Sequence, residues 1–582
     1  MNKEAVLHHP SFQYAYACTK NSIQLRIRTK KSDLQSISLL FGDGFDWHDG
    51  KWNYQQQAVT KNGSCELFDY WEITLNPPNR RLRYAFILES KEERLFYCEK
   101  GFYTDVIYDP GYYFCFPFLH EHEEFQTPDW VKDTIWYQIF PERFANGNSS
   151  NDPEDTLAWN SADPTPTNHF GGDIEGITAH LDYLQELGIN GIYLTPIFKA
   201  YSNHKYDTID YLAIDPNFGD EAAFKTMVEE CHKRGIRVML DAVFNHSGFY
   251  FPPFQDVLEK GEKSKYKDWF HIHEFPIQTE PKANYHTFAF TPFMPKLNTA
   301  HPEVKEYLLN VATHWIEKYD IDGWRLDVAN EVDHEFWREF RKAVRSVKED
   351  VYILGELWHD STPWLYGDQF DSVMNYPFQT NVLDLFVRDR LTPKQFKEKM
   401  TSVYYMYPKP ITEVLFNLVG SHDTPRILTE CKDSVEDVKL ILTLLLTYEG
   451  SPCIYYGDEI GLTGGMDPGC RKCMPWDEAE YNLDLLDHTK KLIALRKREG
   501  LLRNQGTLTW MEHEGLLLFK VTEEEKSIYV LINPTLDEQH VTLEASDGHT
   551  QWHDEWQNKA YATTASVQVT VPKKQFAILS SK

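Results

Sequence analysis

The pattern of apolar and polar positions divides the chain into three regions. From residue 1 to about 120, apolar residues alternate with polar ones in short runs such as SISLLF and FDYWEITL, with Gly, Asn and Pro between the runs. A period of two is typical of strands buried on one face, so we predict an N-terminal β-sandwich over residues 1–122. The polar stretch HEHEEFQTPD then separates this region from the next.

Between residues 128 and 504, eight apolar runs alternate with amphipathic helical patterns. The runs are TIWYQIF, GINGIYLTP, GIRVMLDAVFNH, IDGWRLDVAN, VYILGELW, DSVMNYP, EVLFNLVGSHD and SPCIYYGDE. Before the fourth run, the segment 302–319 places Val304, Leu308, Val311, Trp315 and Tyr319 on one helical face. Eight strand–helix repeats predict an α/β fold, the (β/α)8 TIM barrel.

Two other segments interrupt or follow this pattern. Residues 246–300, after the third run, are far longer than an ordinary loop, so we predict an inserted domain in the third βα loop. From residue 505 to 582 the chain returns to alternating runs such as GLLLFKV and SIYVLINP. This pattern predicts a C-terminal β-sandwich, so that a β-sandwich flanks the barrel on each side.

Charge and hydropathy exclude several classes of partner. The chain has 59 Lys and Arg against 88 Asp and Glu, a net charge of -29, which repels nucleic acid and anionic membrane surfaces. The first residues lack the apolar core of a signal peptide, and no stretch reaches the roughly 20 apolar residues that span a membrane. We therefore expect a cytoplasmic protein that binds neither nucleic acid nor membrane.

Cysteine and histidine patterns do not favour a zinc site. The nine cysteines are scattered, and the one CxxC, from Cys470 to Cys473, has no second ligand pair. We interpret both as free thiols in a loop. The HIH sequence at 271–273 has no third ligand at a suitable spacing, so we reject zinc there too.

Polar side chains gather where the predicted barrel strands end. In such barrels the carboxyl ends of the strands carry the catalytic residues. The residues at these ends are Asp241, Asn245 and His246 on the third strand, Arg325 and Asp327 on the fourth, Glu356 on the fifth, and His422 and Asp423 on the seventh. A lone acid of this kind could equally form a buried ion pair, but the whole set favours an active site.

Two of these acids have different predicted surroundings. Arg325 lies two residues before Asp327 and points to the same side, so its charge should lower the pKa of Asp327 and keep it ionised as a nucleophile. Glu356 precedes Leu357 and Trp358, where partial desolvation should raise its pKa and keep it protonated as an acid. Adjacent strands, about 4.8 Å apart, can deliver the separation of about 5–5.5 Å that retaining glycosidases use.

The sequence resembles a known family at these positions. DAVFNH, GWRLDVANE, GELW and LVGSHD resemble, in order and spacing, the four conserved regions of the α-amylase family of glycoside hydrolases. MPKLN at 294–298 and the pair Asn330 and Glu331 are similar to the subgroup of neopullulanases, cyclomaltodextrinases and maltogenic amylases. The resemblance covers nearly the whole chain.

The resemblance implies roles for individual residues. Asp327 would be the nucleophile, Glu356 the general acid/base and Asp423 the third carboxylate, which stabilises the transition state, while Arg325 orients the nucleophile. The implied contacts with the cleaved glucosyl unit and the next sugar are His204, Tyr206, His246, His422, Asp467 and Arg471. On the leaving-group side they are Glu331, Trp358, Phe288 and Phe290, although such an aromatic is more often a packing residue than a ligand contact.

The resemblance also implies an activity. It is the hydrolysis of α-1,4-glucosidic bonds in cyclodextrins, pullulan, malto-oligosaccharides or starch by double displacement, with transglycosylation. An α-1,6-acting or mainly transglycosylating relative is an alternative, because the same triad serves all these reactions. A non-catalytic glucan-binding protein is a third possibility, against which the intact triad argues. In this subgroup the N-terminal module helps to build a homodimer.

A calcium site is the remaining implication of the resemblance. FANGNSSNDP offers Asn146, Asn148, Asn151 and Asp152 as oxygen ligands, with Gly171 and Asp173 downstream in FGGD. The usual pattern has an acid where this chain has Asn148, which removes charge from the site. A metal-free turn is the alternative.

Overall fold

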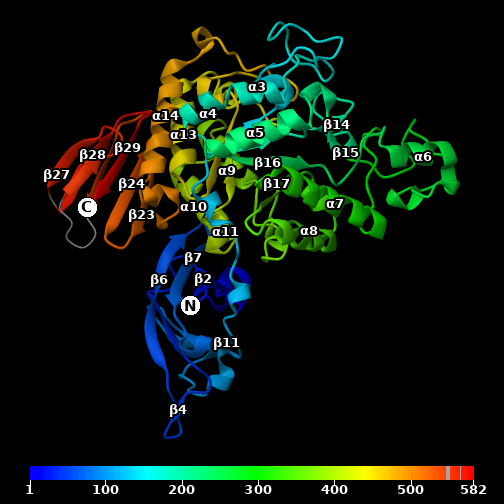
Figure 1. Cartoon of the computed structure of the whole chain (residues 1–582). Coiled ribbons are helices and arrows are strands. Elements are labelled where there is room, and N and C mark those ends of the chain that lie inside the picture. The colour runs from blue at the N-terminus through cyan, green and yellow to red at the C-terminus, as the bar shows by residue number, and fades with distance from the viewer. Residues whose placement is uncertain (545–550, 564, 582) are drawn as a thin grey trace.

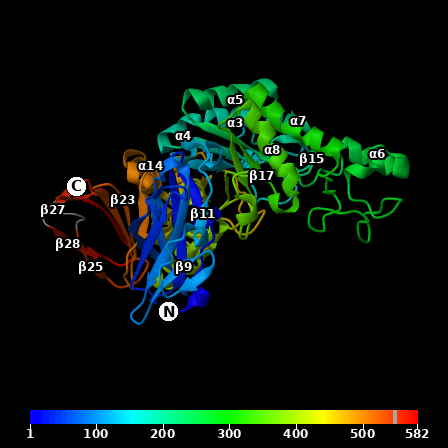
Figure 2. The ribbon, with the colours of Figure 1, turned by 90° about the horizontal axis from the view of Figure 1, so that it is seen from below.

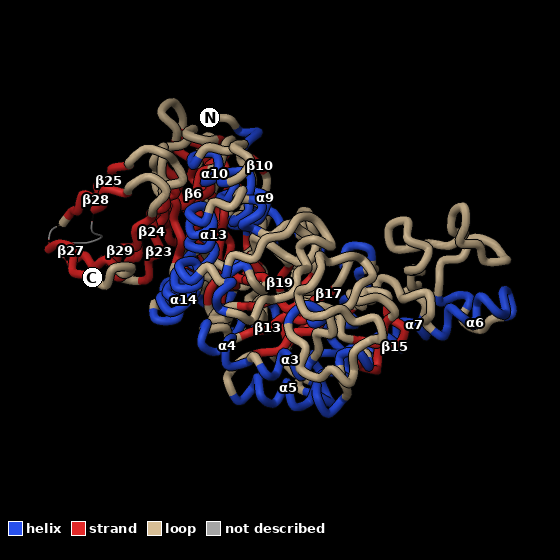
Figure 3. The backbone as a smooth tube through the Cα atoms, turned by 90° about the horizontal axis from the view of Figure 1, so that it is seen from above, coloured by secondary structure: helices blue, strands red, loops and turns tan. Residues whose placement is uncertain are grey.

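The computed structural model describes residues 1–544, 551–563 and 565–581. Figure 1 shows a central barrel, an N-terminal domain below it in blue and a C-terminal domain beside it in orange and red. A lobe that contains α6 (Pro252–Lys260) extends from the side of the barrel away from the C-terminal domain, as Figure 3 also shows. The predicted fold, a TIM barrel with an insertion and flanking β domains, is confirmed.

The N-terminal domain is an antiparallel sandwich with the sheet order β1-β2-β7-β6-β3-β8-β9-β10, and β11 pairs with β8. Its β-strands are β1 (Ala15–Thr19), β2 (Ser22–Lys30), β3 (Ser36–Gly42), β4 (Trp47–His48), β5 (Lys51–Trp52), β6 (Gln55–Ser64), β7 (Phe68–Leu75), β8 (Leu82–Glu89), β9 (Arg94–Cys98), β10 (Gly101–Tyr103) and β11 (Phe114–Phe116). The long strand β6 pairs with β3 at its start and with β7 at its end, so it joins the two layers. Alternate residues such as Ile23, Leu25 and Ile27 fill the core between them.

Eight parallel strands form the barrel, one within each predicted apolar run. They are β12 (Trp136–Ile139), β13 (Gly191–Leu194), β16 (Arg237–Ala242), β17 (Gly323–Leu326), β18 (Tyr352–Gly355), β19 (Ser372–Val373), β20 (Phe416–Asn417) and β21 (Ser451–Tyr455). A parallel bridge between Met374 and Phe416 joins the two ends of the sheet and closes the barrel. The strands read as continuous apolar runs because they are buried on both faces.

Helices cover the barrel. They are α1 (Asp129–Lys132), α2 (Pro141–Phe144), α3 (Ile174–Ala179), α4 (Leu181–Leu187), α5 (Glu221–Lys233), α7 (Pro302–Tyr319), α8 (His334–Val347), α9 (Tyr376–Phe386), α10 (Pro393–Tyr404), α11 (Lys409–Thr412), α12 (Ile427–Glu430), α13 (Val435–Thr447) and α14 (Leu483–Arg498). All five residues predicted to share one face of the segment 302–319 are buried in α7. Side chains cap several of the amino ends: Asp220 begins α5 and Asp333 begins α8, each accepting from the third backbone N–H of its helix.

The inserted lobe is anchored to the end of the third barrel strand. His246 and Lys296 form an antiparallel bridge, and the N–H of Ser247 donates to the carbonyl of Pro295 at 3.0 Å. A short hairpin of β14 (Phe198–Ala200) and β15 (Thr208–Ile214), after β13, lies beside it. These contacts hold the lobe beside the carboxyl ends of the strands.

The C-terminal domain is a β-sandwich, and the outer face of its larger sheet packs against the barrel helices. A six-stranded sheet, in the order β22-β23-β24-β29-β26-β27, packs against the pair β25-β28. The strands are β22 (Thr507–Trp510), β23 (Leu517–Glu523), β24 (Lys526–Ile532), β25 (Gln539–Glu544), β26 (Gln551–Asp554), β27 (Lys559–Thr563), β28 (Ser566–Val571) and β29 (Phe576–Ser581). Leu516 and Leu518 face β25 and β28, whereas Leu517 and Phe519 join the cluster of the barrel helices. In the view from below, this domain and the N-terminal domain lie side by side (Figure 2).

Among the residues that the structure describes, every helix is too short or too polar to cross a bilayer.

Candidate active site

A cavity of about 450 Å³ opens at the carboxyl ends of the barrel strands. Asp327 follows β17 directly, Glu356 follows β18 and Asp423 comes after β20. The lining residues are His204, Tyr206, His246, Phe288, Met294, Asp327, Val328, Asn330, Glu331, Glu356, Trp358, His422, Asp423, Asp467 and Arg471. The structure thus brings together the three predicted catalytic carboxylates and all the predicted sugar contacts except Arg325, which lies beneath them, and Phe290, which projects into solvent with 93% exposure.

A larger cavity, about 790 Å³, lies at the other end of the barrel, between the N-terminal domain and the strand starts. Two of the cations that line it are paired, Arg26 with Glu72 at 3.1 Å and Lys132 with Glu413 at 3.2 Å. The three predicted catalytic carboxylates lie in the smaller cavity, so that cavity is the candidate active site.

Arg325 connects the carboxylates from below. Its Nη1 lies 2.8 Å from Asp327 Oδ1 and 3.0 Å from Asp241, and its Nη2 lies 2.9 Å from Glu356 Oε2. The guanidinium is fully buried. We expected Arg325 to accompany Asp327 and apolar side chains to surround Glu356. Arg325 does contact Asp327, but the expectation for Glu356 was wrong, because the neighbouring strands β17 and β18 bring both carboxylates to the same guanidinium.

The expected electrostatics of Asp327 were also wrong in direction. Burial raises the pKa of Asp327 well above its ordinary value, the charges of Glu356 and Asp241 raise it further, and Arg325 opposes them. Asp327 is only 6% exposed, and three carboxylates share one guanidinium. The pKa of Asp241 is likewise raised by burial, to about 6. The three carboxylates around Arg325 would therefore carry more negative charge, if all were ionised, than this one guanidinium neutralises.

Glu356 is held by two further donors. Its Oε2 accepts from the backbone N–H of Val328 at 3.0 Å, and its Oε1 accepts from Trp358 Nε1 at 3.1 Å. Val328 has a φ of +45°, which is strained for a β-branched residue and turns its N–H toward the carboxylate. The indole of Trp358 stacks on Tyr376 with ring centroids 3.5 Å apart. Backbone strain and stacking thus fix the position of Glu356.

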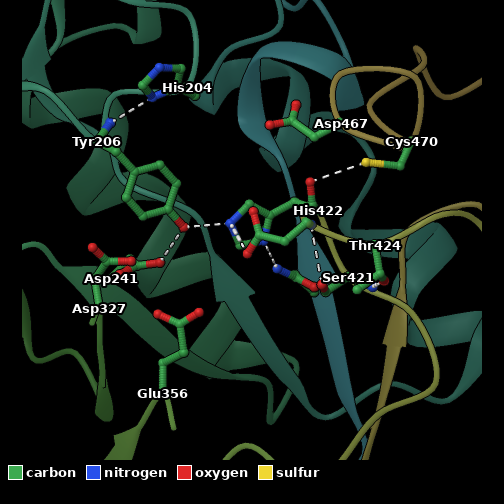
Figure 4. A network of polar contacts seen from close by, with 12 residues as sticks. His204, Tyr206, Asp241, Asp327, Glu356, Ser421, His422, Thr424, Asp467 and Cys470 are labelled. Atoms are coloured by element: carbon green, nitrogen blue, oxygen red, sulfur yellow. Dashed lines mark hydrogen bonds and ion pairs between the residues drawn. The ribbon is translucent and has the colours of Figure 1, made fainter. Parts of the chain in front are cut away.

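A hydrogen-bonded network forms the inner wall of the cavity (Figure 4). Gln138 Nε2 donates to His422 Nδ1 at 2.7 Å, so Nε2 of His422 carries the proton and donates to the Tyr206 hydroxyl at 2.7 Å. Tyr206 donates in turn to Asp241 at 2.8 Å. The rings of Tyr206 and His422 lie parallel, 4° apart. Both rings are therefore fixed before any ligand binds.

The histidines of the cavity are neutral. Burial lowers the pKa of His204 to about 3 and that of His246 to about 3, and it lowers the pKa of His422 too. Nε2 of His246 is buried, with no hydrogen-bond partner among the described residues. It is thus available to a sugar hydroxyl at the cavity wall.

The loop after β21 adds a cation to the same wall. Arg471 lies 2.8 Å from Asp467 and 3.3 Å from Asp423 Oδ1, and its Nε donates to the carbonyl of His422 at 2.9 Å. Burial raises the pKa of Asp423, and Arg471 opposes that shift. The thiol of Cys470 donates to the same carbonyl, at 3.1 Å, and Cys470 and Cys473 are both buried free thiols. The loop therefore positions Asp423 through Arg471.

The opposite wall of the cavity is more open. Glu331 and Trp358 are both exposed, and Phe288 stacks on His246 with centroids 5.0 Å apart. Lys296 donates to the carbonyl of Glu331 at 2.9 Å and to its Oε2 at 3.3 Å. This wall is formed by the loops after β17 and β18 and by the inserted lobe.

Some of the predicted calcium ligands fit a hard cation. Oδ1 of Asn151 is buried without a hydrogen-bond partner among the described residues, and Asp152 accepts only from the amide of Asn146, at 2.8 and 3.1 Å. Gly171 has a φ of +80°, and a Cβ there would lie 2.3 Å from Asp152 Oδ1. These oxygens form a cradle with at least one unsatisfied acceptor, which suits Ca²⁺.

The other two predicted ligands have structural partners. Asp173 accepts from the N–H groups of Gly147, Asn148 and Gly176 at 3.0, 2.8 and 2.6 Å, and it caps α3. Oδ1 of Asn148 accepts from Ser150. In residues 1–544, 551–563 and 565–581, no group of three or more His, Cys, Asp or Glu is arranged to hold a metal. A cation here would rely on amide and backbone oxygens.

Sequence reasoning gave no role to Val328, whose N–H donates to Glu356, nor to four other residues of the site. Gln138 orients His422, Tyr193 donates to Asp241 at 2.6 Å, Tyr376 supports Trp358, and Met294 lines the cavity. Gln138 and Tyr193 were visible as polar groups inside apolar strand runs. Met294 begins the MPKLN motif, whereas Tyr376 carried no comparable signal.

Three carboxylates in one cavity at the carboxyl ends of barrel strands suit a glycoside hydrolase, and the comparisons with known proteins show that class. The family model "Alpha amylase, catalytic domain" matches residues 138–495, and "Alpha amylase, N-terminal ig-like domain" matches residues 1–120. A maltogenic alpha-amylase from Bacillus acidopullulyticus is 57% identical over 92% of each chain, and a cyclomaltodextrinase from Geobacillus thermopakistaniensis (strain MAS1) is 58% identical over 92% of this chain and 91% of its own. A solved structure of a cyclomaltodextrinase, 47% identical, matches all of both chains with a TM-score of 0.95. The chain belongs to the α-amylase family of hydrolases.

Proposed function

We propose that the protein hydrolyses α-1,4-glucosidic bonds of cyclodextrins, pullulan and malto-oligosaccharides by double displacement, with transglycosylation as a second outcome. The observation that carries the proposal is the single guanidinium of Arg325, which contacts Asp327 at 2.8 Å and Glu356 at 2.9 Å. The two carboxyls follow neighbouring barrel strands, β17 and β18, which lie about 4.8 Å apart, and both side chains reach the same guanidinium. This supports the retaining separation of about 5–5.5 Å over the inverting one of about 6.5–9.5 Å.

In the first step, Asp327 attacks the anomeric carbon while Glu356 gives its proton to the departing glycosidic oxygen. A glucosyl ester on Asp327 forms as the glycosidic bond breaks. In the second step, Glu356 takes a proton from water, whose oxygen attacks the same carbon and releases Asp327. Asp423, held by Arg471 at 3.3 Å, is placed to bind the sugar hydroxyls as the ring flattens.

The names of the relatives support the substrate class. The chain is similar to proteins named maltogenic amylase, cyclomaltodextrinase and neopullulanase, and the cavity is open on the side where a sugar beyond the cleaved bond would lie. The test is incubation with β-cyclodextrin, pullulan and starch, with the products separated by chromatography. Reducing sugar, with maltose as main product from β-cyclodextrin, is expected. Binding without product would leave a glucan-binding protein, and cleavage confined to α-1,6 bonds would indicate the debranching alternative.

We also propose that a calcium ion is held at Asn151 and Asp152, with Asn146 and the backbone near Gly171 as further ligands. When bound, the ion would stabilise this turn and take no part in bond cleavage. Calorimetry with CaCl₂ and with EDTA tests it: added calcium should raise the melting temperature, and Asn151→Ala should abolish that increase. Equal melting temperatures under both conditions would favour the metal-free turn.

We further propose a cytoplasmic homodimer that assembles through the N-terminal domain. Large exposed aromatic residues gather near the tip of this domain: Phe45, Trp47, Tyr54, Tyr108 and Tyr112. An exposed patch of this kind is typical of an interface. Sedimentation of the full chain should give a dimer, and Phe45→Ser with Trp47→Ser should give a monomer; a wild-type monomer at micromolar concentration would contradict the proposal. Cell fractionation tests the location.

A further inference from the structure

The two sequence features that suggested the subgroup, MPKLN and the pair Asn330 and Glu331, contact each other through the side chain of Lys296. Lys296 belongs to MPKLN in the inserted lobe, and Glu331 follows the strand of Asp327. The ammonium of Lys296 donates to the backbone carbonyl of Glu331 at 2.9 Å and to its Oε2 at 3.3 Å, and it also donates to Oδ1 of Asn245. An ammonium has three donors, so all three are engaged by the loops after β16 and β17.

The backbone of Lys296 is fixed as firmly as its side chain. It forms an antiparallel bridge with His246, and its N–H donates to the carbonyl of His286 at 3.0 Å. Leu297 donates to the carbonyl of Asn245 at 3.0 Å. Lys296 therefore joins three parts of the cavity rim: the inserted lobe, the loop of His246 and the loop of Glu331.

We propose that Lys296 is a positioning residue that fixes Glu331 on the leaving-group side and so determines how well a sugar is held there. This inference rests on the proposed function, because it assumes that Glu331 faces the leaving group and the incoming acceptor. Glu331 lines the cavity on the same wall as Asn330 and Trp358, but it is largely exposed. Lys296 is its only ion-pair partner within the described chain. Without Lys296, Glu331 would lose the donor to its carboxylate and the donor to its backbone carbonyl.

The consequence for group transfer follows from the chemistry of the glucosyl ester. A sugar hydroxyl oxygen attacks the anomeric carbon, its bond to that carbon forms as the bond to Asp327 breaks with its electron pair, and the hydroxyl proton passes to Glu356. A water molecule attacks the anomeric carbon in the same way, but no sugar then has to be bound on the leaving-group side. Loss of Lys296 should therefore weaken reactions in which a sugar occupies the leaving-group side and leave the others almost unchanged.

The experiment compares two donors in the full-length enzyme. Maltotriose carries a sugar leaving group, and α-maltosyl fluoride does not. For Lys296→Met, kcat/KM on maltotriose and the ratio of transfer to hydrolysis products should both fall about five- to tenfold, while the rate on the fluoride changes less than about twofold. Lys296→Arg should restore part of the loss, since it keeps the charge and several donors.

Coupling to Glu331 separates positioning from general damage. Glu331→Gln should show the same selective loss, and the double variant should be no worse than either single one. Lys305→Met is the matched control, because Lys305 pairs with Glu335 at 3.0 Å on the outer helices; it should leave both donors unaffected.

Equal losses on both donors, an unchanged Lys296→Met enzyme, or additive losses in the double variant would overturn the proposal. A wild-type enzyme without activity on either donor would instead refute the proposed function. Thermal unfolding of each variant shows whether it is folded at the assay temperature.

Discussion

The two walls of the active-site cavity differ in how firmly their side chains are held. On the wall of Tyr206, His422 and Arg471, each polar group has one or more protein partners within 2.7 to 3.3 Å. On the wall of Glu331 and Trp358, the side chains are exposed and each has one polar partner, Lys296 for Glu331 and Glu356 for Trp358. A prearranged wall suits the sugar unit common to every substrate, whereas the open wall is where substrates and acceptors differ.

The largest expected effect lies between the walls, at the nucleophile. Asp327→Asn should lower kcat by about 10⁴-fold or more on every donor, because no glucosyl ester can form. Stopped assays with maltotriose and with α-maltosyl fluoride measure it. Asp320→Asn, an exposed aspartate before the same strand, is the control and should be near wild type. A rate within tenfold of wild type would contradict the assignment.

The effect of replacing the acid/base Glu356 should depend on the leaving group of the donor. Glu356→Gln should slow cleavage of maltotriose by about 10²- to 10⁴-fold, because a sugar must be protonated as it departs. Formation of the ester from α-maltosyl fluoride should suffer much less, since fluoride needs little protonation. Burst kinetics on both donors would measure the difference, with exposed Glu349→Gln as control. Equal losses in the first step would argue against the acid role.

On the prearranged wall, removal of a single hydroxyl group should lower the activity on every donor. Tyr206→Phe keeps the ring but removes the donor to Asp241 and the acceptor of His422, so kcat/KM should fall about 10- to 100-fold on all donors alike. Tyr201→Phe, an exposed tyrosine nearby, serves as the control. A loss that depended on the leaving group would erase the distinction between the two walls.

A substitution on the open wall should change the activity less, and by an amount that depends on the donor. Trp358→Phe can still stack on Tyr376 but loses the N–H that donates to Glu356, so we expect a change of about two- to fivefold that is larger for maltotriose than for the fluoride. Steady-state kinetics on both donors provide the measurement. A uniform loss as large as that of Tyr206→Phe would place Trp358 functionally with the other wall.

The pH profile separates the carboxylates from the histidines. Asp327 must be ionised to attack, and its pKa is raised above 3.8, so kcat/KM should fall on the acid side at a higher pH than an ordinary aspartate gives. His204 and His246, with pKa values of about 3, stay neutral there and cannot cause that fall. The profile on α-maltosyl fluoride measures it. An acid limb at or below pH 4 would contradict the raised pKa.

The fold was largely predictable because barrel strands are apolar runs and the residues at their ends are polar. The same pattern located Asp327, Glu356 and Asp423. The electrostatics were not predictable, since the pKa of Asp327 depends on Asp241 and Glu356, which other strands bring close. Gln138 and His422, 284 positions apart, share a hydrogen bond that no local pattern shows. The contact between Lys296 and Glu331 likewise depends on how the inserted lobe folds back.

The apolar contact between the C-terminal sheet and the barrel helices limits how the protein can be divided in protein engineering. Leu517, Phe519 and Val530 belong to the same apolar cluster as α13 and α14. A chain cut at residue 504 would expose that surface to water, and a transplanted C-terminal domain would need matching side chains on both helices. The barrel and this sandwich should therefore melt as one cooperative unit, and hybrid enzymes should exchange them together.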